Sequence, residues 1–163
     1  MKKNIIYIVF LLVSFLLSYQ SSYAASLEKQ MLQKLGSEVL VDSSVEQKLG
    51  DKLYYLEDVD DQYSLEIVQS LANSAWRKSE VSTPNFGYTD SSYWFRVSLK
   101  SADKSLDKLL AIQYALLDHI EVYVLDNGTI RQTYLTGDVF PFEQRSIRHR
   151  DFLFPIVFQA NQV

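Results

Sequence analysis

The sequence predicts an all-β fold, an antiparallel sandwich or jelly roll, and three observations support this prediction. From residue 93 onward, apolar residues alternate with polar residues along several short segments. Turn-forming residues separate these segments at regular intervals. Helical spacing of apolar residues is confined to short stretches in the first half of the chain, and a length of 163 residues suits one domain of this kind.

The first 24 residues have the pattern of a secretory signal peptide. Two lysines precede an apolar run from residue 5 to residue 17, and small residues follow, ending in Ala24 and Ala25. A helix that spans a membrane needs about 20 apolar residues, so this shorter run predicts export and cleavage after Ala24. The alternative is an anchor that is not cleaved.

The composition indicates in which compartment the protein works and which classes of partner it does not bind. The formal net charge is -4, so a surface that binds nucleic acid is not expected. The chain contains no cysteine, which excludes disulfides, thiolate metal sites and a cysteine nucleophile. An exported chain without cysteine favours the bacterial periplasm or the cell exterior.

The exported part begins with a short helical segment. Residues 25–37 are expected to form this lead-in, because their apolar residues recur at four-residue spacing. The domain itself is expected over residues 38–163, and it begins with a strand at 39–41. Ser64 is expected to cap a helical turn that reaches Leu71.

Two-residue alternation starts where the chain enters its second half. One set of residues is expected to face the core: Tyr93, Phe95, Val97 and Leu99. The alternating set is then expected to face away from the core: Trp94, Arg96, Ser98 and Lys100.

Four later segments are expected to be strands: 109–115, 120–125, 130–135 and 152–158. Asp126-Asn127-Gly128 predicts a tight hairpin between the second and the third of these, since asparagine and glycine accept positive φ angles. Pro155 indicates that the last strand either lies at a sheet edge or starts late, because proline donates no backbone hydrogen bond. The sequence stops shortly after this strand, so we expect the domain to lack its last strands.

No segment has the pattern of a catalytic site. The chain lacks a glycine-rich phosphate loop, a Gly-x-Ser-x-Gly elbow and a His-Glu-x-x-His motif. A pair of carboxylates for glycoside hydrolysis would need a separation that sequence does not specify. We therefore expect a protein that is not an enzyme.

The first candidate binding residues are Trp94 and Arg96. They are two positions apart on an expected strand and therefore share a face. A tryptophan ring covers the apolar face of a sugar, while arginine donates hydrogen bonds to the hydroxyls, so the pair is typical of a carbohydrate site. The alternative is that Trp94 packs internally and that Arg96 lies over it toward an acid.

A second candidate is a basic loop between residues 137 and 150, where four side chains can carry positive charge: Arg145, Arg148, His149 and Arg150. Such a cluster can bind a carboxylate or phosphate group of a ligand. The alternative is internal pairing with one of three neighbouring acids: Asp138, Glu143 and Asp151.

No cofactor is expected. The acidic stretch 57–61 marks a loop that has the oxygens for calcium but lacks the spacing and the glycine of an EF-hand, so a solvated turn is favoured. Any other metal would need oxygen ligands or the two histidines, His119 and His149. His119, next to Asp118, is interpreted as a hydrogen-bonded structural histidine.

Four segments of the chain resemble one family of domains: 55–58, 86–96, 116–123 and 137–152. This family is the type 2 extracellular domain of bacterial seven-transmembrane receptors with diverse intracellular signalling modules. The resemblance runs from about Val39 to the end of the sequence. It implies a jelly-roll sandwich similar to carbohydrate-binding modules, and a sensory role outside the inner membrane.

The resemblance also implies candidate residues, ligands and partners. Five residues fall on recurrent positions of the family: Trp94, Arg96, Arg145, Arg148 and His149. Sugars and calcium are the ligand classes considered for it. In such receptors the domain precedes seven helices that lead to a histidine kinase or a diguanylate cyclase. The closing strands and these helices are not in this sequence, so contact with a membrane is expected only through segments that would continue the chain.

We therefore expect a periplasmic domain that senses a small molecule or a glycan as the N-terminal part of such a receptor. One alternative is a protein-interaction module that docks another receptor ectodomain or forms a homodimer. Another is a secreted protein that binds carbohydrate or calcium by itself.

Overall fold

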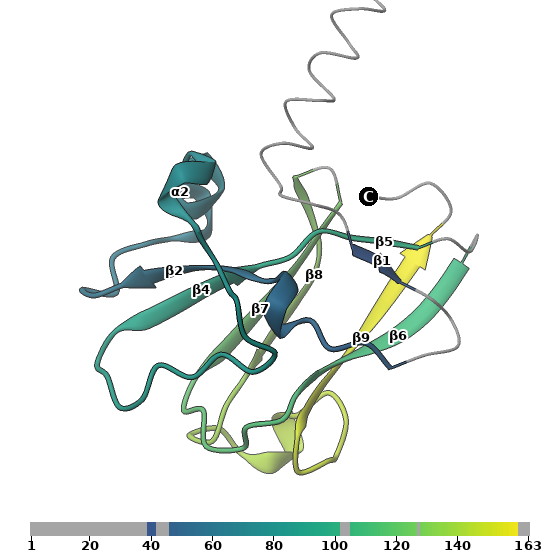
Figure 1. Ribbon diagram of the computed structural model, residues 1–163. Helices are drawn as coiled ribbons and strands as arrows, with labels where there is room; N and C mark the ends of the chain where they lie inside the picture. Colours follow the sequence, from purple (N-terminus) through teal and green to yellow (C-terminus); the bar gives the residue numbers. More distant parts are fainter. Residues whose placement is uncertain (1–38, 42–45, 102–104, 127, 160–163) are drawn as a thin grey trace, which may run out of the picture.

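The computed structural model of the chain describes residues 39–41, 46–101, 105–126 and 128–159 (Figure 1). Strands dominate this part of the chain, which confirms the predicted all-β sandwich. The predicted signal peptide over 1–24 and the helical lead-in over 25–37 lie outside the described residues. The jelly-roll connection stays a prediction.

The described strands, in chain order, are β1 (Val39–Val41), β2 (Tyr54–Asp58), β3 (Arg77–Lys78), β4 (Ser92–Arg96), β5 (Leu99–Ser101), β6 (Ser105–Ile112), β7 (Ile120–Asp126), β8 (Thr129–Thr136) and β9 (Phe152–Gln159). One α-helix, α2 (Leu65–Ser70), and three single turns of 3-10 helix, η1 (Gly50–Lys52), η2 (Asn73–Ala75) and η3 (Phe142–Gln144), connect them.

Strand pairing is antiparallel in three of the four described sheets. These are the three-stranded sheet β3-β2-β4 and the two pairs β6-β9 and β7-β8. The β7-β8 hairpin confirms the turn expected at 126–128. The fourth sheet, β1-β5, is parallel, which the sequence did not predict. A parallel pair needs a long connection, and the segment between Val41 and Leu99 supplies one.

The hydrophobic core lies between β9 and the strands next to it. The alternation predicted for 152–158 is confirmed, because four of its side chains are buried: Phe152, Phe154, Ile156 and Phe158. Ile120 of β7 is buried with them, and Val122 and Val124 pack against the same cluster. Within the described residues β9 pairs only with β6, so Pro155 lies on an edge strand as expected.

The faces of β4 differ from the expectation. Phe95, expected in the core, has 45% of its surface exposed, and the core cluster contains neither Tyr93 nor Phe95. The strand breaks after Arg96, and the next strand, β5, does place Leu99 against the core. The alternation therefore identified two faces correctly, but the face with Phe95 does not enter the core cluster, because Phe95 packs against Phe86 of the loop before β4 and stays exposed.

The connection between β2 and α2 is fixed by side chains. Ser64 caps α2 as predicted, because its hydroxyl accepts a hydrogen bond from the backbone N–H of Ile67 at 3.4 Å. The acidic stretch begins within β2 rather than in a loop. Asp58 is buried, and its carboxylate accepts hydrogen bonds from the backbone N–H groups of Gln62 and Tyr63 at 3.0 and 2.8 Å.

The described residues contain neither a cluster of potential metal ligands nor a membrane-spanning helix. Their His, Asp and Glu side chains include no group of three that could hold a metal ion. No described helix has both the length and the apolar character needed to cross a membrane.

Candidate functional site

The indole of Trp94 lies on the same face of β4 as the side chain of Arg96, and it is partly exposed. Its neighbour is Tyr123 of β7, whose ring is nearly parallel to the indole, with centroids 6.5 Å apart and planes 14° apart. The two rings together form an aromatic surface at the junction of β4 and β7. Such a surface is suited to the flat apolar face of a cyclic ligand.

A carboxylate lies beside this aromatic surface. Glu121 Oε2 accepts a hydrogen bond from the hydroxyl of Tyr123, and Glu121 Oε1 lies 2.9 Å from His119 Nε2. All three side chains are directed outward from β7 or from the segment that leads into it, and the side chains of His119 and Glu121 are about half exposed, at 54% and 42%. The carboxylate is therefore held in place and remains open to solvent.

The hydrogen bonds shift the titration of both partners. The hydrogen bonds from Tyr123 and His119 lower the pKa of the Glu121 carboxyl. The hydrogen bond to the same carboxylate, with a smaller contribution from burial, raises the pKa of Tyr123 to about 12. The phenol thus stays protonated, and the carboxylate stays charged, across the physiological range.

Sequence reasoning missed this network. His119 was interpreted as a hydrogen-bonded structural histidine next to Asp118, and the structure shows that its hydrogen-bond partner is Glu121 and that its ring lies 5.5 Å from that of Phe140. One signal was present. His119, Glu121 and Tyr123 alternate with the apolar residues of β7, so their side chains had to share the face away from the core.

We expect Glu121→Gln to lower the pKa of Tyr123 from about 12 toward the ordinary tyrosine value of 10.0, because the negative acceptor is removed. The signal of the phenol carbon in ¹³C-labelled tyrosine, followed by NMR during an alkaline titration, measures this. Because the folded-state pKa is raised, the stabilisation from the network is present below pH 10.0 and is lost as the pH rises toward 12.

The matched control is Glu143→Gln, which removes an exposed carboxylate of η3. It should leave the titration of Tyr123 unchanged. An unchanged pKa of Tyr123 in the Glu121 variant would contradict the hydrogen bond on which the network depends.

Arg96 is engaged by residues of the chain itself. Its guanidinium lies over the ring of Trp76, 4.3 Å from the centroid, and Nη2 donates to the side-chain oxygen of Asn73 at 2.7 Å. Burial lowers the pKa of this guanidinium below its ordinary value. The alternative considered from the sequence was that Arg96 lies over Trp94 and reaches an acid. Arg96 does stack on a tryptophan, but this is Trp76 rather than Trp94, and its hydrogen-bond partner is the amide of Asn73.

Arg145 is likewise engaged within its own loop. Nη1 donates to the backbone carbonyls of His149 and Arg150 at 2.7 and 2.6 Å. The guanidinium also lies 4.3 Å from the ring centroid of Phe152 and 5.0 Å from that of Phe142. These contacts close the loop onto the start of β9, so Arg145 determines the shape of the loop.

The other cations of the loop are exposed. Arg148 makes no hydrogen bond or ion pair with the described residues, whereas Arg150 lies 3.4 Å from a carboxylate oxygen of Asp151. His149 Nδ1 accepts the backbone N–H of Asp151 at 3.1 Å, and its side chain remains 47% exposed. Of the three acids considered as internal partners, Asp151 is therefore the one that the structure pairs with these cations.

The five candidate residues from the sequence do not form one cluster. Trp94 and Arg96 belong to β4, and no described contact joins them to the loop that carries Arg145, Arg148 and His149. Figure 1 shows the two regions apart, with the loop around η3 beyond the lower ends of β7 and β8. The structure instead brings Trp94 together with Tyr123, Glu121 and His119.

The comparisons with known proteins place this chain in a family. The family model described as 7TMR-DISM extracellular 2 matches residues 50–163, which is most of the chain and includes both regions. No curated protein and no solved structure matched the sequence. The chain therefore belongs to the 7TMR-DISM extracellular 2 family, the extracellular sensory domains of seven-transmembrane receptors.

Proposed function

We propose that this extracellular sensory domain binds a carbohydrate-like ligand on the surface formed by Trp94, Tyr123, Glu121 and His119. We name this the β4-β7 site. The observation that carries the proposal is the pair of parallel rings beside an exposed carboxylate whose position is fixed by two hydrogen bonds.

The chemistry of a sugar fits these groups. The apolar face of a pyranose ring stacks on the indole of Trp94, with an aromatic contact worth about 0.5 to 1.5 kcal/mol beyond its buried area. Glu121 accepts hydrogen bonds from the ring hydroxyls, and a charged acceptor makes such bonds stronger than a neutral one. Since the carboxylate is already positioned, little ordering entropy is lost on binding.

The arginines of the original candidate set take different roles in this proposal. Arg96 supports β4 from the side of Trp76, and Arg145 shapes the basic loop. Arg148 is a separate exposed cation next to the exposed imidazole of His149, and it is available to an acidic group of a ligand or a partner.

In the proposed receptor, the domain lies in the periplasm and its ligand controls a histidine kinase or a diguanylate cyclase beyond the membrane. Binding at the β4-β7 site transmits a signal only if two conformations of the domain bind the ligand with different affinities. The domain supplies recognition, and the segments that continue the chain supply the output.

The test is ligand-induced thermal stabilisation of the purified chain, measured with a panel of exopolysaccharide and cell-wall oligosaccharides. At a ligand concentration 100 times the Kd, binding stabilises the fold by about 2.7 kcal/mol, which raises Tm by several degrees. We expect Trp94→Ala to abolish this rise. The control Phe95→Ala removes an exposed aromatic residue from the other face of the same strand and should keep the rise.

Two outcomes would contradict the proposal. One is a Trp94→Ala variant that folds and is stabilised as much as the wild type. The other is a panel in which no oligosaccharide stabilises the wild type. Should Trp94→Ala fail to fold, Glu121→Gln takes its place, because it keeps the shape of the side chain and removes the charge.

A second candidate function is docking of another receptor ectodomain. Four large hydrophobic side chains are exposed on two loops: Tyr114, Leu116, Val139 and Phe142. Backbone hydrogen bonds from Asp138 and Val139 to the carbonyls of Leu117 and Asp118 join these loops, so the four form one region. Light scattering of the wild type and of Leu116→Asp tests it, since a dimer that the variant dissociates would favour docking.

A further inference from the structure

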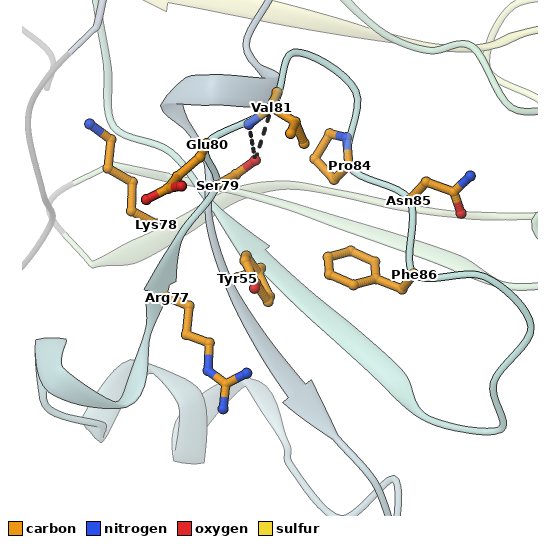
Figure 2. A pocket seen from close by; sticks show the side chains of 9 residues that line it. All are labelled: Tyr55, Arg77, Lys78, Ser79, Glu80, Val81, Pro84, Asn85 and Phe86. Atoms are coloured by element: carbon orange, nitrogen blue, oxygen red, sulfur yellow. Dashed lines mark hydrogen bonds between the residues drawn. The ribbon is translucent and has the colours of Figure 1, made fainter.

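A groove of about 440 Å³ lies on the sheet face that carries Tyr55, opposite the face that carries Trp94 and Arg96 (Figure 2). Nine residues of β2, β3 and the segment after β3 line it: Tyr55, Arg77, Lys78, Ser79, Glu80, Val81, Pro84, Asn85 and Phe86. Its volume lies within the range of small-molecule sites. None of these residues belongs to the candidate set from the sequence or to the β4-β7 site.

One wall of the groove is aromatic and held in place. The rings of Tyr55 and Phe86 are 4.9 Å apart, and Phe86 stacks on Tyr93 with centroids 4.1 Å apart and planes 16° apart. The hydroxyl of Tyr93 donates to Glu57 at 2.9 Å. The wall therefore exists before any ligand binds, and Figure 2 shows both rings lying along it.

The segment opposite this wall is also fixed. Ser79 is buried; its backbone N–H donates to the carbonyl of Leu53 at 2.9 Å, and its hydroxyl donates to the carbonyl of Val81. Gly50 permits this arrangement, because a Cβ there would lie 2.1 Å from the carbonyl oxygen of Ser82. A larger residue at position 50 would displace the segment.

Three polar side chains of the groove have groups that are free to bind a ligand. Arg77 pairs in register with Tyr55, so its guanidinium is on the same face of the sheet as the aromatic wall. Neither Arg77 nor Glu80 makes an ion pair or a side-chain hydrogen bond with the described residues, and both are exposed. Asn85 uses its side-chain oxygen to accept the N–H of Gly87 at 2.9 Å, which leaves its amide NH₂ free to donate.

We propose that this groove binds a hexuronic acid unit of an acidic saccharide. The sugar ring lies on Tyr55 and Phe86, its carboxylate pairs with Arg77 through two parallel hydrogen bonds, and its hydroxyls bond to Glu80 and to the amide of Asn85. The ligand is selected by these contacts acting together, because none of them alone distinguishes a uronic acid from other acids or sugars. A guanidinium on the same sheet face as an aromatic wall selects a cyclic carboxylate, and the exposed carboxylate of Glu80 accepts hydroxyls but repels a second acid.

The test is calorimetric titration of the purified chain with trigalacturonic acid at low ionic strength. Its fully methyl-esterified form is the matched neutral probe, and benzoate is the probe for a carboxylate without hydroxyls. We expect the wild type to bind the acid, and to bind the ester and benzoate at least tenfold more weakly. Arg77→Ala should weaken binding of the acid at least tenfold and should remove its preference over the ester.

Matched variants separate this groove from other sites. Arg150→Ala removes an equally exposed arginine from the basic loop and should leave the affinity for the acid unchanged. Trp94→Ala disables the β4-β7 site and should also leave it unchanged, so the two proposals fail independently. Circular dichroism melting confirms that each variant is folded.

Three results would overturn the proposal for the groove. They are a wild type that does not bind trigalacturonic acid, a folded Arg77→Ala variant that binds it as tightly as the wild type, and equal affinity for the acid and for either control probe. Loss of binding only in Trp94→Ala would assign the acid to the β4-β7 site and would equally overturn it.

Discussion

Phe154→Ala is expected to lower the free energy of unfolding by about 3 to 5 kcal/mol, the usual cost of truncating a buried phenylalanine. Phe154 has 1% of its surface exposed and lies at the centre of the core cluster. Its ring contacts that of Tyr134, with centroids 5.4 Å apart, and its strand partner in register is Leu110. Urea denaturation followed by tryptophan fluorescence measures the loss.

The control for this variant is Val157→Ala. Val157 lies on the same strand but is 46% exposed, so its truncation should change the free energy of unfolding by less than about 0.5 kcal/mol. A loss below about 1 kcal/mol for Phe154→Ala would mean that β9 does not form the centre of the core.

Gly137→Ala is expected to destabilise the fold by about 2 kcal/mol or more, for two reasons. Gly137 has a φ of 151°, which side-chain-bearing residues rarely adopt. A Cβ there would also lie 2.0 Å from the carbonyl oxygen of Asp118 and 2.9 Å from the Cα of His119, so backbone has to move. Since His119 is bonded to Glu121, the displacement should also disturb the β4-β7 site.

Thermal unfolding monitors the stability of this variant, and the titration of Tyr123 reports on the network. Gly128→Ala is the matched control, because its φ of 80° gives backbone strain while a Cβ would meet nothing within 4 Å. The control should cost roughly 1 to 2 kcal/mol and leave Tyr123 unaffected. Equal losses of stability for the two variants would show that the close contact of a Cβ at position 137 with Asp118 and His119 contributes nothing.

Many of the strand positions could be predicted, because they depend on local patterns. The alternation of Phe152, Phe154, Ile156 and Phe158 identified the core strand, and the Asp-Asn-Gly turn identified the β7-β8 hairpin. Ser64 was recognised as a helix cap from the residue type alone. Each of these features involves residues that are close in the sequence, so the sequence contains the whole signal.

The candidate site was predicted only in part. The role of Trp94 in binding stays a prediction, and its partners were expected to be Arg96 and the basic loop. The structure pairs it with Tyr123 instead and directs Arg96 onto Trp76. Both contacts join strands or turns that are distant in the sequence. A sequence also does not distinguish an arginine that stacks on a ring of the protein from one that is free to bind a ligand.

The groove as a site was not predicted from the sequence, because its two walls come from segments whose neighbourhood depends on packing. Arg77 is brought beside Tyr55 by the pairing of β3 with β2, and Phe86 is brought there by stacking on Tyr93. Gly50 permits the close approach of the segment after β3, but a glycine in a sequence does not reveal which backbone it faces.

The sequence by itself determined the all-β class, the family, the core strand β9 and the two faces of β4. The tertiary structure decided which of these faces is covered, which arginines are engaged by the protein and which side chains meet at each site. The physical reason is that alternation follows from the geometry of one strand, whereas burial and hydrogen bonding depend on the segment that packs against it.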